Sequence, residues 1–482
     1  MKKILFIISL LIGFNAFAQN DTLVYKKRVL EATEVDYLLS YYTQDGLHSS
    51  VGGGIGSEEL TDLASNIVVS MPLNDDDVLT VDAGFSAYTS ASSSNINPFQ
   101  KTGASSYVSG TNLRDGGDDD DGLQGGLAYG TPWQASSGAS ASDVLASLVV
   151  NYAHSSDDRN FTWNADVSFS NEYDYTSVGF GGGLSKLFND KNSEISLKAN
   201  AYLDQWRPIY PTELSEYGKY GNNFQNNGYF NNVRVIDETG AAAFDYLPSN
   251  FTVLDQVNRN SYSTSVGFSQ VITPKLQASV FFDLLFQNGL LSTPYHRVYF
   301  KDKANYYIGG AEYINNYTDA SNVGVYQLAD DIERLPNNRF KLPIGVRLNY
   351  YLSERFILRT YYRYYWDDWG LSGHTASIEV PIKISSSFTV YPMYRFYTQN
   401  QSTYFAPFET HVSTEQYYTS DFDLSNFDSN QFGFGATYTD IFTSFSIWKF
   451  GLKNVDFRFN QYNRTDGLKA SIGSLAFKFV FN

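Results

Sequence analysis

The stretch FTWNADVSF, residues 161–169, decides the fold class because apolar and polar side chains alternate along it without a break. Its aromatic and aliphatic residues would lie on one face, and Thr162, Asn164, Asp166 and Ser168 on the other. The same alternation recurs at 195–203 (ISLKANAYL), 79–87, 276–286, 342–350, 356–364, 376–384 and 388–396. A period of two over this length indicates β-strands with one apolar face.

Strand length and connection length distinguish a membrane barrel from a soluble sandwich. The strands run roughly nine to twelve residues, which suits tilted strands crossing a bilayer, whereas many soluble strands have about five or six. Long segments at 91–141, 207–259, 290–339 and 401–429 alternate with short polar turns at Asn74–Asp77, Ser156–Arg159, Asn189–Ser193, Thr273–Lys275, Ser353–Arg355 and Ser385–Ser387. Short turns at one end and long loops at the other are typical of outer-membrane barrels.

We therefore predict an all-β fold, a transmembrane antiparallel up-and-down β-barrel of about sixteen strands with long extracellular loops. The expected strands are approximately 35–43, 63–72, 78–90, 143–155, 159–172, 175–187, 193–206, 260–272, 274–289, 340–352, 355–367, 373–384, 388–399, 430–440, 453–463 and 467–481. An even count places both termini at the periplasmic end, and sixteen strands normally enclose a lumen.

Two places in the last strands are irregular. Residues 441–452 could be a structured turn or additional strand residues. In the final strand, the apolar residues from Leu475 to Phe481 share one parity, as expected of a lipid-facing strand, whereas Ala470 and Ile472 have the opposite parity. This change of phase predicts a β-bulge near Gly473.

The beginning of the chain predicts export. Residues 1–18 combine Lys2 and Lys3 with a short apolar core and the small-residue site Ala16-Phe17-Ala18, which is typical of a cleaved signal peptide. The alternative, an N-terminal membrane anchor, would need a longer apolar stretch. We expect residues 19–34 to form a short periplasmic segment and 35–482 to form the barrel.

Composition excludes several classes of protein. The chain of 482 residues has no Cys, which excludes disulfide scaffolds, thiolate metal sites and Cys nucleophiles. Its net charge of -17 argues against nucleic acid as a partner, because phosphate binding needs an excess of Lys and Arg. The expected partners are outer-membrane lipids and, if the barrel has an accessory role, another envelope protein.

Several segments resemble a family of Gram-negative outer-membrane β-barrels known only as a domain of unknown function. These are TEVDYLLSYYTQDGLHSSVGGGIGSEELTD (33–62), SGASASD (137–143), YRYYWDDWGLSGHTASIEVPIKISSSFTVYPMYRFYTQNQSTYFAP (362–407) and YYTSDFDLS (417–425). The resemblance implies an outer-membrane barrel. Because members of this family are often encoded near a small lipoprotein, it also implies a lipoprotein as a candidate partner.

The strands between 340 and 399 are predicted to place a strip of positive charge on the lumen face. Its members are Lys341, Arg347, Arg355, Arg359, Arg363, Lys383 and Arg395, with Glu379 among them. Such a strip could bias a pore toward anions or hold an anionic ligand. Alternatively, the cations pair with Asp36, Asp82, Asp166 or Asp283 on other strands, or with a loop folded into the barrel.

Two glycine-containing segments leave alternatives open. Asp115, Asp118, Asp119, Asp120 and Asp121 could supply oxygen ligands for Ca²⁺, or they could form a solvated acidic loop; we expect no other cofactor. Gly179, Gly181 and Gly183 would leave room on the inner face for a plug segment, or they could mark a kink in the wall.

The function classes that remain are a pore, a plugged barrel and, more remotely, a hydrolase. Tyr-rich loops such as 217–229 and 306–317 suit carbohydrate or protein contacts, or loops that pack on one another and close the mouth. His48 beside Ser49 and Ser50, and His374 near Ser372, are close only in sequence, so we assign no catalytic residues. We expect a pore or transporter for small hydrophilic solutes, which could include anions; the alternative is a non-conducting structural or assembly partner.

Overall fold

The computed structural model describes residues 28–88, 123–124, 127–128, 143–172, 174–255, 257–317 and 324–481. The expected signal peptide, the residues of the Asp-rich segment from Asp115 to Asp121, and most of the predicted loop 91–141 lie outside this part of the chain.

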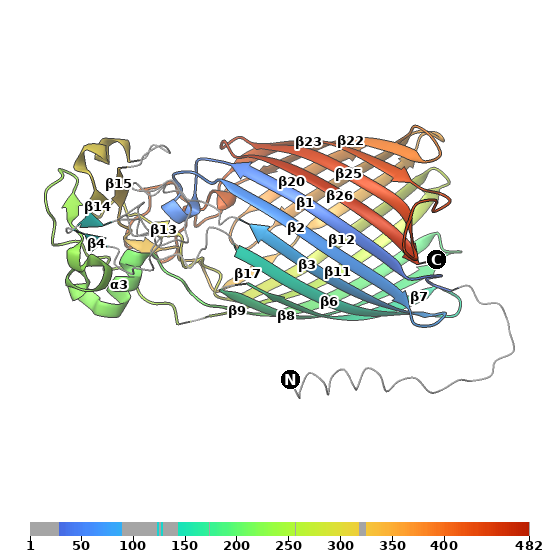
Figure 1. Cartoon of the computed structure of the whole chain (residues 1–482), viewed down its shortest axis with the longest axis horizontal. Helices are drawn as coiled ribbons and strands as arrows, with labels where there is room; N and C mark the ends of the chain where they lie inside the picture. The colour runs from blue at the N-terminus through green and yellow to red at the C-terminus, as the bar shows by residue number, and fades with distance from the viewer. Residues whose placement is uncertain are drawn as a thin grey trace, which may run out of the picture.

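Sixteen long antiparallel strands close into a barrel (Figure 1), which confirms the predicted fold class and strand number. Closure comes from the first and last strands, where Tyr37 lies opposite Phe477 and Asp36 opposite Lys478. In chain order the strands are β1 (Glu34–Asp45), β2 (Leu60–Pro72), β3 (Asp77–Tyr88), β6 (Asp143–Ser155), β7 (Phe161–Asn171), β8 (Tyr175–Phe188), β9 (Ser193–Trp206), β11 (Asn258–Thr273), β12 (Leu276–Gly289), β17 (Asn338–Lys341) continued by β18 (Ile344–Tyr351), β19 (Ile357–Trp366), β20 (Ser372–Glu379) continued by β21 (Ile382–Lys383), β22 (Phe388–Gln399), β23 (Phe427–Thr439), β25 (Phe450–Arg464) and β26 (Lys469–Phe481).

Two strands are interrupted at proline. Pro343 separates β17 from β18, and Pro381 separates β20 from β21. Proline has no backbone N–H to donate to a neighbouring strand, so the ladder is broken locally. The carbonyl oxygens remain in use: Pro343 O accepts from Asp283 N at 3.0 Å, and Pro381 O accepts from Ile357 N at 3.1 Å.

The β-bulge predicted near Gly473 is wrong. Strand β26 keeps a continuous register through Gly473 with both neighbours, and the irregularity lies in the partner strand β25, between Leu452 and Asn454. Ala470 and Ile472 therefore face the inside of the barrel, on the same side as Gln44 and Tyr42 of β1. Apolar residues at the inner face produced the phase change in the sequence.

The connection between β23 and β25 is a turn. Residues 440–449 join β23 to β25 and contain β24 (Ser446–Ile447), which pairs back onto the start of β25. Of the two alternatives for residues 441–452, a structured turn or additional strand residues, the structure therefore shows mainly a turn. Phe442 and Trp448 are among its exposed aromatic residues.

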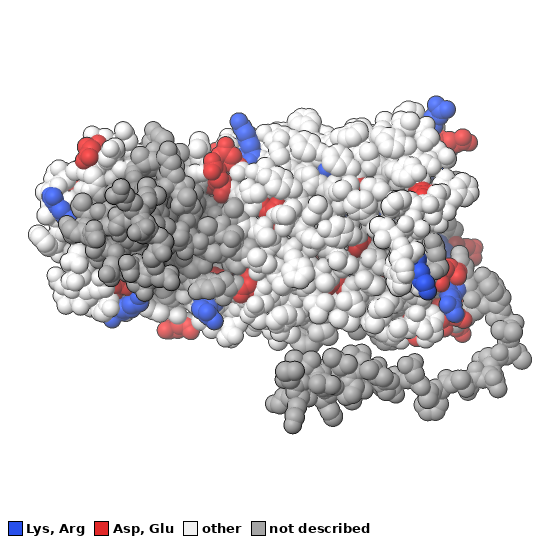
Figure 2. Space-filling view, in the orientation of Figure 1, with Lys and Arg blue, Asp and Glu red and all other residues white. Residues whose placement is uncertain are grey.

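The outside of the barrel is apolar. Outward positions carry exposed residues such as Leu348, Phe434 and Phe459, which would be unfavourable in water and suit a lipid environment. The face seen in Figure 2 is mostly uncharged along the barrel wall and carries most of its charged side chains toward the two ends.

The long loops pack together beyond one end of the barrel, and we call the assembly formed by the described residues of 46–59, 207–257, 290–337 and 400–426 the cap (Figure 1). One of its apolar clusters joins Val51, Phe224, Phe230, Tyr246 and Tyr326, with Tyr217, Tyr229 and Tyr306 packed against it. The Tyr-rich loops thus pack on one another. The elements of the cap are η1 (Ser50–Gly52), α3 (Thr212–Tyr220), η2 (Gly221–Asn226), η3 (Gly228–Asn232), β10 (Val235–Asp237), β13 (Arg297–Val298), β14 (Tyr306–Gly309), η4 (Ala311–Asn316), β15 (Val325–Gln327), β16 (Asp331–Ile332) and η5 (Phe422–Leu424).

Two further short strands, β4 (Leu123–Gln124) and β5 (Leu127–Ala128), pair with each other. None of the described helices has the length and apolarity needed to cross a bilayer.

Candidate functional site

The strand register places most of the predicted positive strip on one inner face. Arg347 lies opposite Tyr361, and Arg363 lies opposite Gly345, so both arginines share the side of the wall that Glu379 and Arg395 occupy further along. Lys341 and Lys383 continue this face near opposite ends of the barrel, opposite Leu285 and Thr389.

Arg355 lies at the end of the wall, where its carbonyl oxygen accepts from Lys383 N at 2.8 Å. Strand β19 begins only at Ile357, so Arg355 lies in the short exposed turn after β18, where its backbone N–H donates to Ser353 Oγ at 3.3 Å. The predicted strand 355–367 is two residues too long at this end, so Arg355 lies beside the lumen strip and not within a strand of it.

Pairing within the strip is local. Glu379 accepts from Arg359 Nη1 at 2.7 Å across adjacent strands, and Arg458 approaches the same carboxylate at 3.8 Å. Among the described residues, no ion pair joins Arg347, Arg363 or Arg395 to an acidic side chain. The strip therefore keeps positive charge that its own carboxylates do not neutralise.

The expected partners on other strands do not reach the strip. Asp36 instead pairs with Lys478 at 3.3 Å. Asp82, Asp166 and Asp283 make no ion pair within the described part of the chain, although the register turns them to the inner face. One side of the lumen is thus rich in Arg, and the strands β1 to β9 carry several Asp residues.

Sequence reasoning missed Arg458, which extends the strip onto β25. It lies opposite Gly435, donates to Asp456 at 3.1 Å and stacks over Tyr391 at 4.7 Å from the ring centre. The alternation along β25 could have identified Arg458, because it falls on the positions that face the lumen. It was missed because the predicted strip covers only the strands between 340 and 399.

The three inner glycines of β8 do not face a plug among the described residues. A Cβ at Gly179 would come 2.7 Å from the ring of Tyr202, and one at Gly183 would come 2.5 Å from Asn164 Oδ1. Side chains of the adjacent strands β7 and β9 fill this space.

A second cluster of polar residues lies in the cap. His296 precedes β13, Glu333 follows β16, and Asp421 precedes η5; their ligand atoms all lie within 4.8 Å of one another. His296 Nδ1 is 3.5 Å from Glu333 Oε2, and its Nε2 is 3.1 Å from Ser50 Oγ. We call His296, Glu333 and Asp421 the cap cluster.

The surrounding backbone holds the cap cluster in place. Glu333 accepts from Thr293 N at 2.7 Å and from Thr419 Oγ1 at 2.5 Å, so both carboxylate oxygens are fixed. Asp421 accepts from Asp423 N at 2.9 Å, as the N-cap of η5. These bonds orient both acids without neutralising either charge.

Glycines bring Ser50 into contact with His296. Gly53 and Gly54 have φ values of 75° and 92°, a left-handed conformation that side chains disfavour. An added Cβ at Gly53 would lie 2.7 Å from the ring of Tyr299, and one at Gly54 would lie 2.8 Å from Ser420 O. The glycines therefore allow loop 46–59 to pack closely on its neighbours.

The electrostatics of the cap cluster favour bound protons or a cation. Burial, followed by the nearby charge of Asp423, raises the pKa of Asp421 to about 7. Burial alone lowers the pKa of His296, but Glu333, Asp421 and Asp423 together raise it above its usual value. An imidazole beside two carboxylates could hold a metal ion or, with Ser50, resemble a serine–histidine–acid arrangement.

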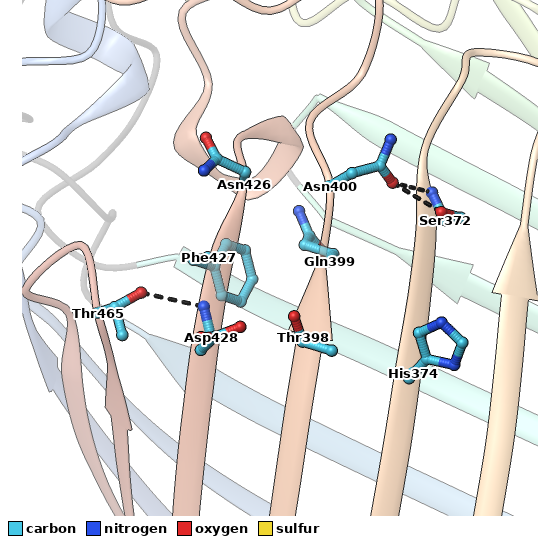
Figure 3. A pocket seen from close by; sticks show the side chains of 9 residues that line it. All are labelled: Ser372, His374, Thr398, Gln399, Asn400, Asn426, Phe427, Asp428 and Thr465. Carbon is cyan, nitrogen blue, oxygen red and sulfur yellow. Dashed lines mark hydrogen bonds between the residues drawn. The ribbon is translucent and has the colours of Figure 1, made fainter.

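A third candidate is a polar pocket of about 540 Å³ at the cap-side rim of the barrel (Figure 3). Its hydrogen bonds join neighbouring segments: Ser372 N and Oγ donate to Asn400 Oδ1, and Asp428 N donates to Thr465 Oγ1. His374 and Ser372 line this pocket, and none of the three residues of the cap cluster does. The two residues therefore lie at the rim of the barrel, apart from the cap cluster.

The solved structures that match this chain are barrels, and both their sequence identities and their TM-scores to it are low. A bacterial polysaccharide outer membrane secretin has a TM-score of 0.41 at 9% identity, covering 93% of this chain and 98% of its own. The P. putida toluene transporter TodX scores 0.35 at 10% identity, covering 94% and 91%. Pseudomonas aeruginosa OccK2, solved with glucuronate, scores 0.37 at 7% identity, covering 95% and 100%.

Comparison with curated proteins finds no match. The sequence family described as protein of unknown function, DUF3570, matches residues 18–476, which is nearly the whole chain. The resemblance drawn from the sequence is therefore confirmed. The chain belongs to the DUF3570 family.

Proposed function

We propose that this protein is a channel for small hydrophilic solutes in the outer membrane of a Gram-negative bacterium, with a preference for anions. The observation that carries the proposal is the set of arginines on the inner face, of which Arg347, Arg363 and Arg395 have no acidic partner among the described residues. The signal peptide that the sequence predicts at residues 1–18 would deliver the chain to the envelope.

The position of the cap supports a conducting lumen. A barrel of sixteen strands is wide enough to enclose water rather than a packed core. Loops 207–257 and 290–337, which could have filled it, carry α3, β14 and β15 beyond the end of the barrel (Figure 1). Solutes would then meet the charged wall after passing beside the cap.

The arginines define the expected selectivity. Unpaired guanidinium groups lower the energy of an anion in the lumen, and Asp residues on the opposite strands create a field across it. Arg347 and Arg363 also stack on Tyr361 and Tyr365 at 5.6 and 5.9 Å, which holds their head groups against the wall. We infer a path for small anions or zwitterions along this wall.

Single-channel conductance of the purified mature barrel in a planar bilayer under a salt gradient tests the proposal. We expect discrete steps with a reversal potential shifted toward the anion, and a shift toward the cation in the double variant Arg363→Glu, Arg395→Glu. Arg355→Glu is the control, because it reverses one charge in an exposed turn at the end of the wall. Conduction with selectivity equal in all three proteins would refute the role of the strip.

The cap also favours a second candidate, a non-conducting barrel that assembles with an envelope protein such as a lipoprotein. The observation behind it is the apolar core of the cap, which makes a stable structure across the loop end. Absence of conductance from a barrel whose folding is verified by its heat-modifiable mobility in gels would refute the channel and favour this alternative. Neither candidate requires a catalytic residue.

A further inference from the structure

We propose that the cap cluster, His296, Glu333 and Asp421, binds one divalent transition-metal ion of the Zn²⁺ type. The ion would join loop 290–337, which supplies His296 and Glu333, to loop 400–426, which supplies Asp421. This site is separate from the lumen strip and does not depend on whether the barrel conducts.

The spacing of the donor atoms is the first argument. At 3.5 Å, His296 Nδ1 and Glu333 Oε2 are too far apart for a good hydrogen bond. Two ligands about 2.0–2.1 Å from a tetrahedral Zn²⁺ are about 3.3–3.4 Å apart, which this separation nearly matches. Asp421 completes a set of three ligand atoms within 4.8 Å of one another.

The second argument is that the cap cluster contains a ring nitrogen without a hydrogen-bond partner and two carboxylates without a Lys or Arg partner among the described residues. His296 Nδ1 is shielded from solvent and has no hydrogen-bond partner within the described structure. No Lys or Arg forms an ion pair with Glu333 or Asp421 in the described residues, while the neighbouring Asp423 is paired with Arg464 at 2.5 Å. Two carboxylates and one imidazole, held close together with the Glu333 carboxylate buried, are stabilised by a cation.

The surrounding bonds resemble those that orient metal ligands. In metal sites, the second ring nitrogen of a ligating histidine is usually fixed by a hydrogen bond. Here Ser50 Oγ holds His296 Nε2, while Thr293 N and Thr419 Oγ1 hold the two oxygens of Glu333. Three protein ligands would leave one position of a tetrahedral ion for water or a ligand.

The donor types set the metal class. One imidazole nitrogen and two carboxylate oxygens suit Zn²⁺, Mn²⁺ or Fe²⁺, whereas Ca²⁺ and Mg²⁺ prefer sites made entirely of oxygen. This separates the cap cluster from the Ca²⁺ site considered for the Asp-rich segment, which has oxygen donors alone and lies outside the described residues.

A hydrolase built from Ser50, His296 and Glu333 explains the arrangement less well. The amides of Gly52, Gly53 and Gly54, which could stabilise an oxyanion, already donate to the carbonyls of Ser49 and Ser50. Asp421 would also have no part in such a triad, whereas it completes a metal site.

The test is calorimetric titration of the chelator-treated, full mature barrel in detergent with Zn²⁺. We expect one equivalent to bind, and His296→Gln and Asp421→Asn each to weaken binding by more than about 100-fold, since even outer-shell partners are worth about 10–100-fold. The side-chain amide oxygen introduced by Asp421→Asn can still accept the Asp423 N–H, so the loop should keep its fold. Asp302→Asn is the matched control, because Asp302 also joins the two loops, through Ser413, but lies outside the cap cluster.

Two further readouts keep the test independent of folding. Co²⁺ should give the intense visible absorption of a tetrahedral site in the wild type and in Asp302→Asn, and Zn²⁺ should slow hydrogen exchange at 290–300 and 419–424. Binding unchanged in His296→Gln and Asp421→Asn, no stoichiometric binding at all, or preference for Ca²⁺ over Zn²⁺ would each overturn the proposal. Covalent labelling of Ser50 by a fluorophosphonate would overturn it in favour of the hydrolase.

Discussion

Replacing Glu213 with Gln should unfold the cap while the barrel stays intact. Arg297 and Glu213 are fully buried in the cap and form a two-point contact, Nε to Oε1 at 2.8 Å and Nη2 to Oε2 at 3.3 Å. Glutamine keeps the shape of the side chain and removes its charge, so Arg297 would remain buried without a counter-ion. Breaking a buried pair from one side typically costs about 3–5 kcal/mol.

The structure shows why this cost should fall on the whole cap. Glu213 lies on α3 and also accepts from Ala329 N at 3.2 Å, while Arg297 lies on β13 and also donates to Val51 O at 3.3 Å. The pair therefore joins α3, β13, η1 and the segment before β16. With its loss, these segments should open together.

Hydrogen exchange measured by mass spectrometry is the assay. A loss of about 3–5 kcal/mol corresponds to exchange faster by about two to nearly four orders of magnitude at about 1.36 kcal/mol per decade. We expect that acceleration at 212–220 and 297–300, with the strands of the barrel unchanged. The double variant Glu213→Leu, Arg297→Met should recover most of the protection, because an apolar pair of similar volume can replace a buried ion pair. Exchange in Glu213→Gln equal to wild type, or a double variant worse than the single one, would refute this reasoning.

Three other predictions concern the cap and the barrel wall. Burial, with the nearby charges of Asp331 and Asp302, raises the pKa of Asp330 to about 7. Between its ordinary pKa and pH 7 the folded cap therefore holds a proton on Asp330 that the unfolded chain has released, so the cap loses stability as the pH rises toward 7. Proteolysis of the metal-free cap should accordingly be slower at about pH 5.5 than at about pH 8. Gly53→Val should destabilise the cap by about 2–4 kcal/mol in the same exchange assay, because valine is strained at a φ of 75° and its side chain would collide with the ring of Tyr299. Gly473→Val is the control and should not destabilise the cap, because the space around Gly473 is open. Phe434→Arg should destabilise the membrane-inserted barrel in urea by about 2–4 kcal/mol, because it faces lipid, while Phe442→Arg in the exposed turn should have a small effect.

The barrel could be predicted from the sequence because each of its strands separates two environments. Lipid outside and lumen inside force the alternation seen at 161–169, and the structure places β7 at Phe161–Asn171. The prediction failed where the inner face is apolar, at Ala470 and Ile472, because parity alone then points to a bulge. It also began the strand at Arg355, two residues before β19 begins at Ile357, because strand and turn residues are equally polar there.

The cap cluster could not be predicted in the same way. Ser50 and His296 are 246 positions apart, and only the packing of three loops brings them to 3.1 Å. Loops have no period that reports which side chains meet, so sequence proximity suggested His48 for Ser50. In the structure His48 stacks on Phe422 at 3.8 Å between ring centres, with its Nδ1 3.1 Å from Gly54 O.

The short loop 46–59 connects the two proposals, because it is the place where the cap cluster, the buried ion pair and the barrel meet. Ser50 contacts His296, Val51 O accepts from Arg297, and the loop runs directly into β1 and β2 of the wall. A metal ion in the cap cluster would stiffen this loop at the mouth. Because the proposed solute path runs beside the cap, Zn²⁺ should bind without changing the conductance, and the metal would then serve the stability of the cap alone. A lower open probability with Zn²⁺ in the wild type, and not in Asp421→Asn, would show that solutes pass through the cap and would contradict the proposed path.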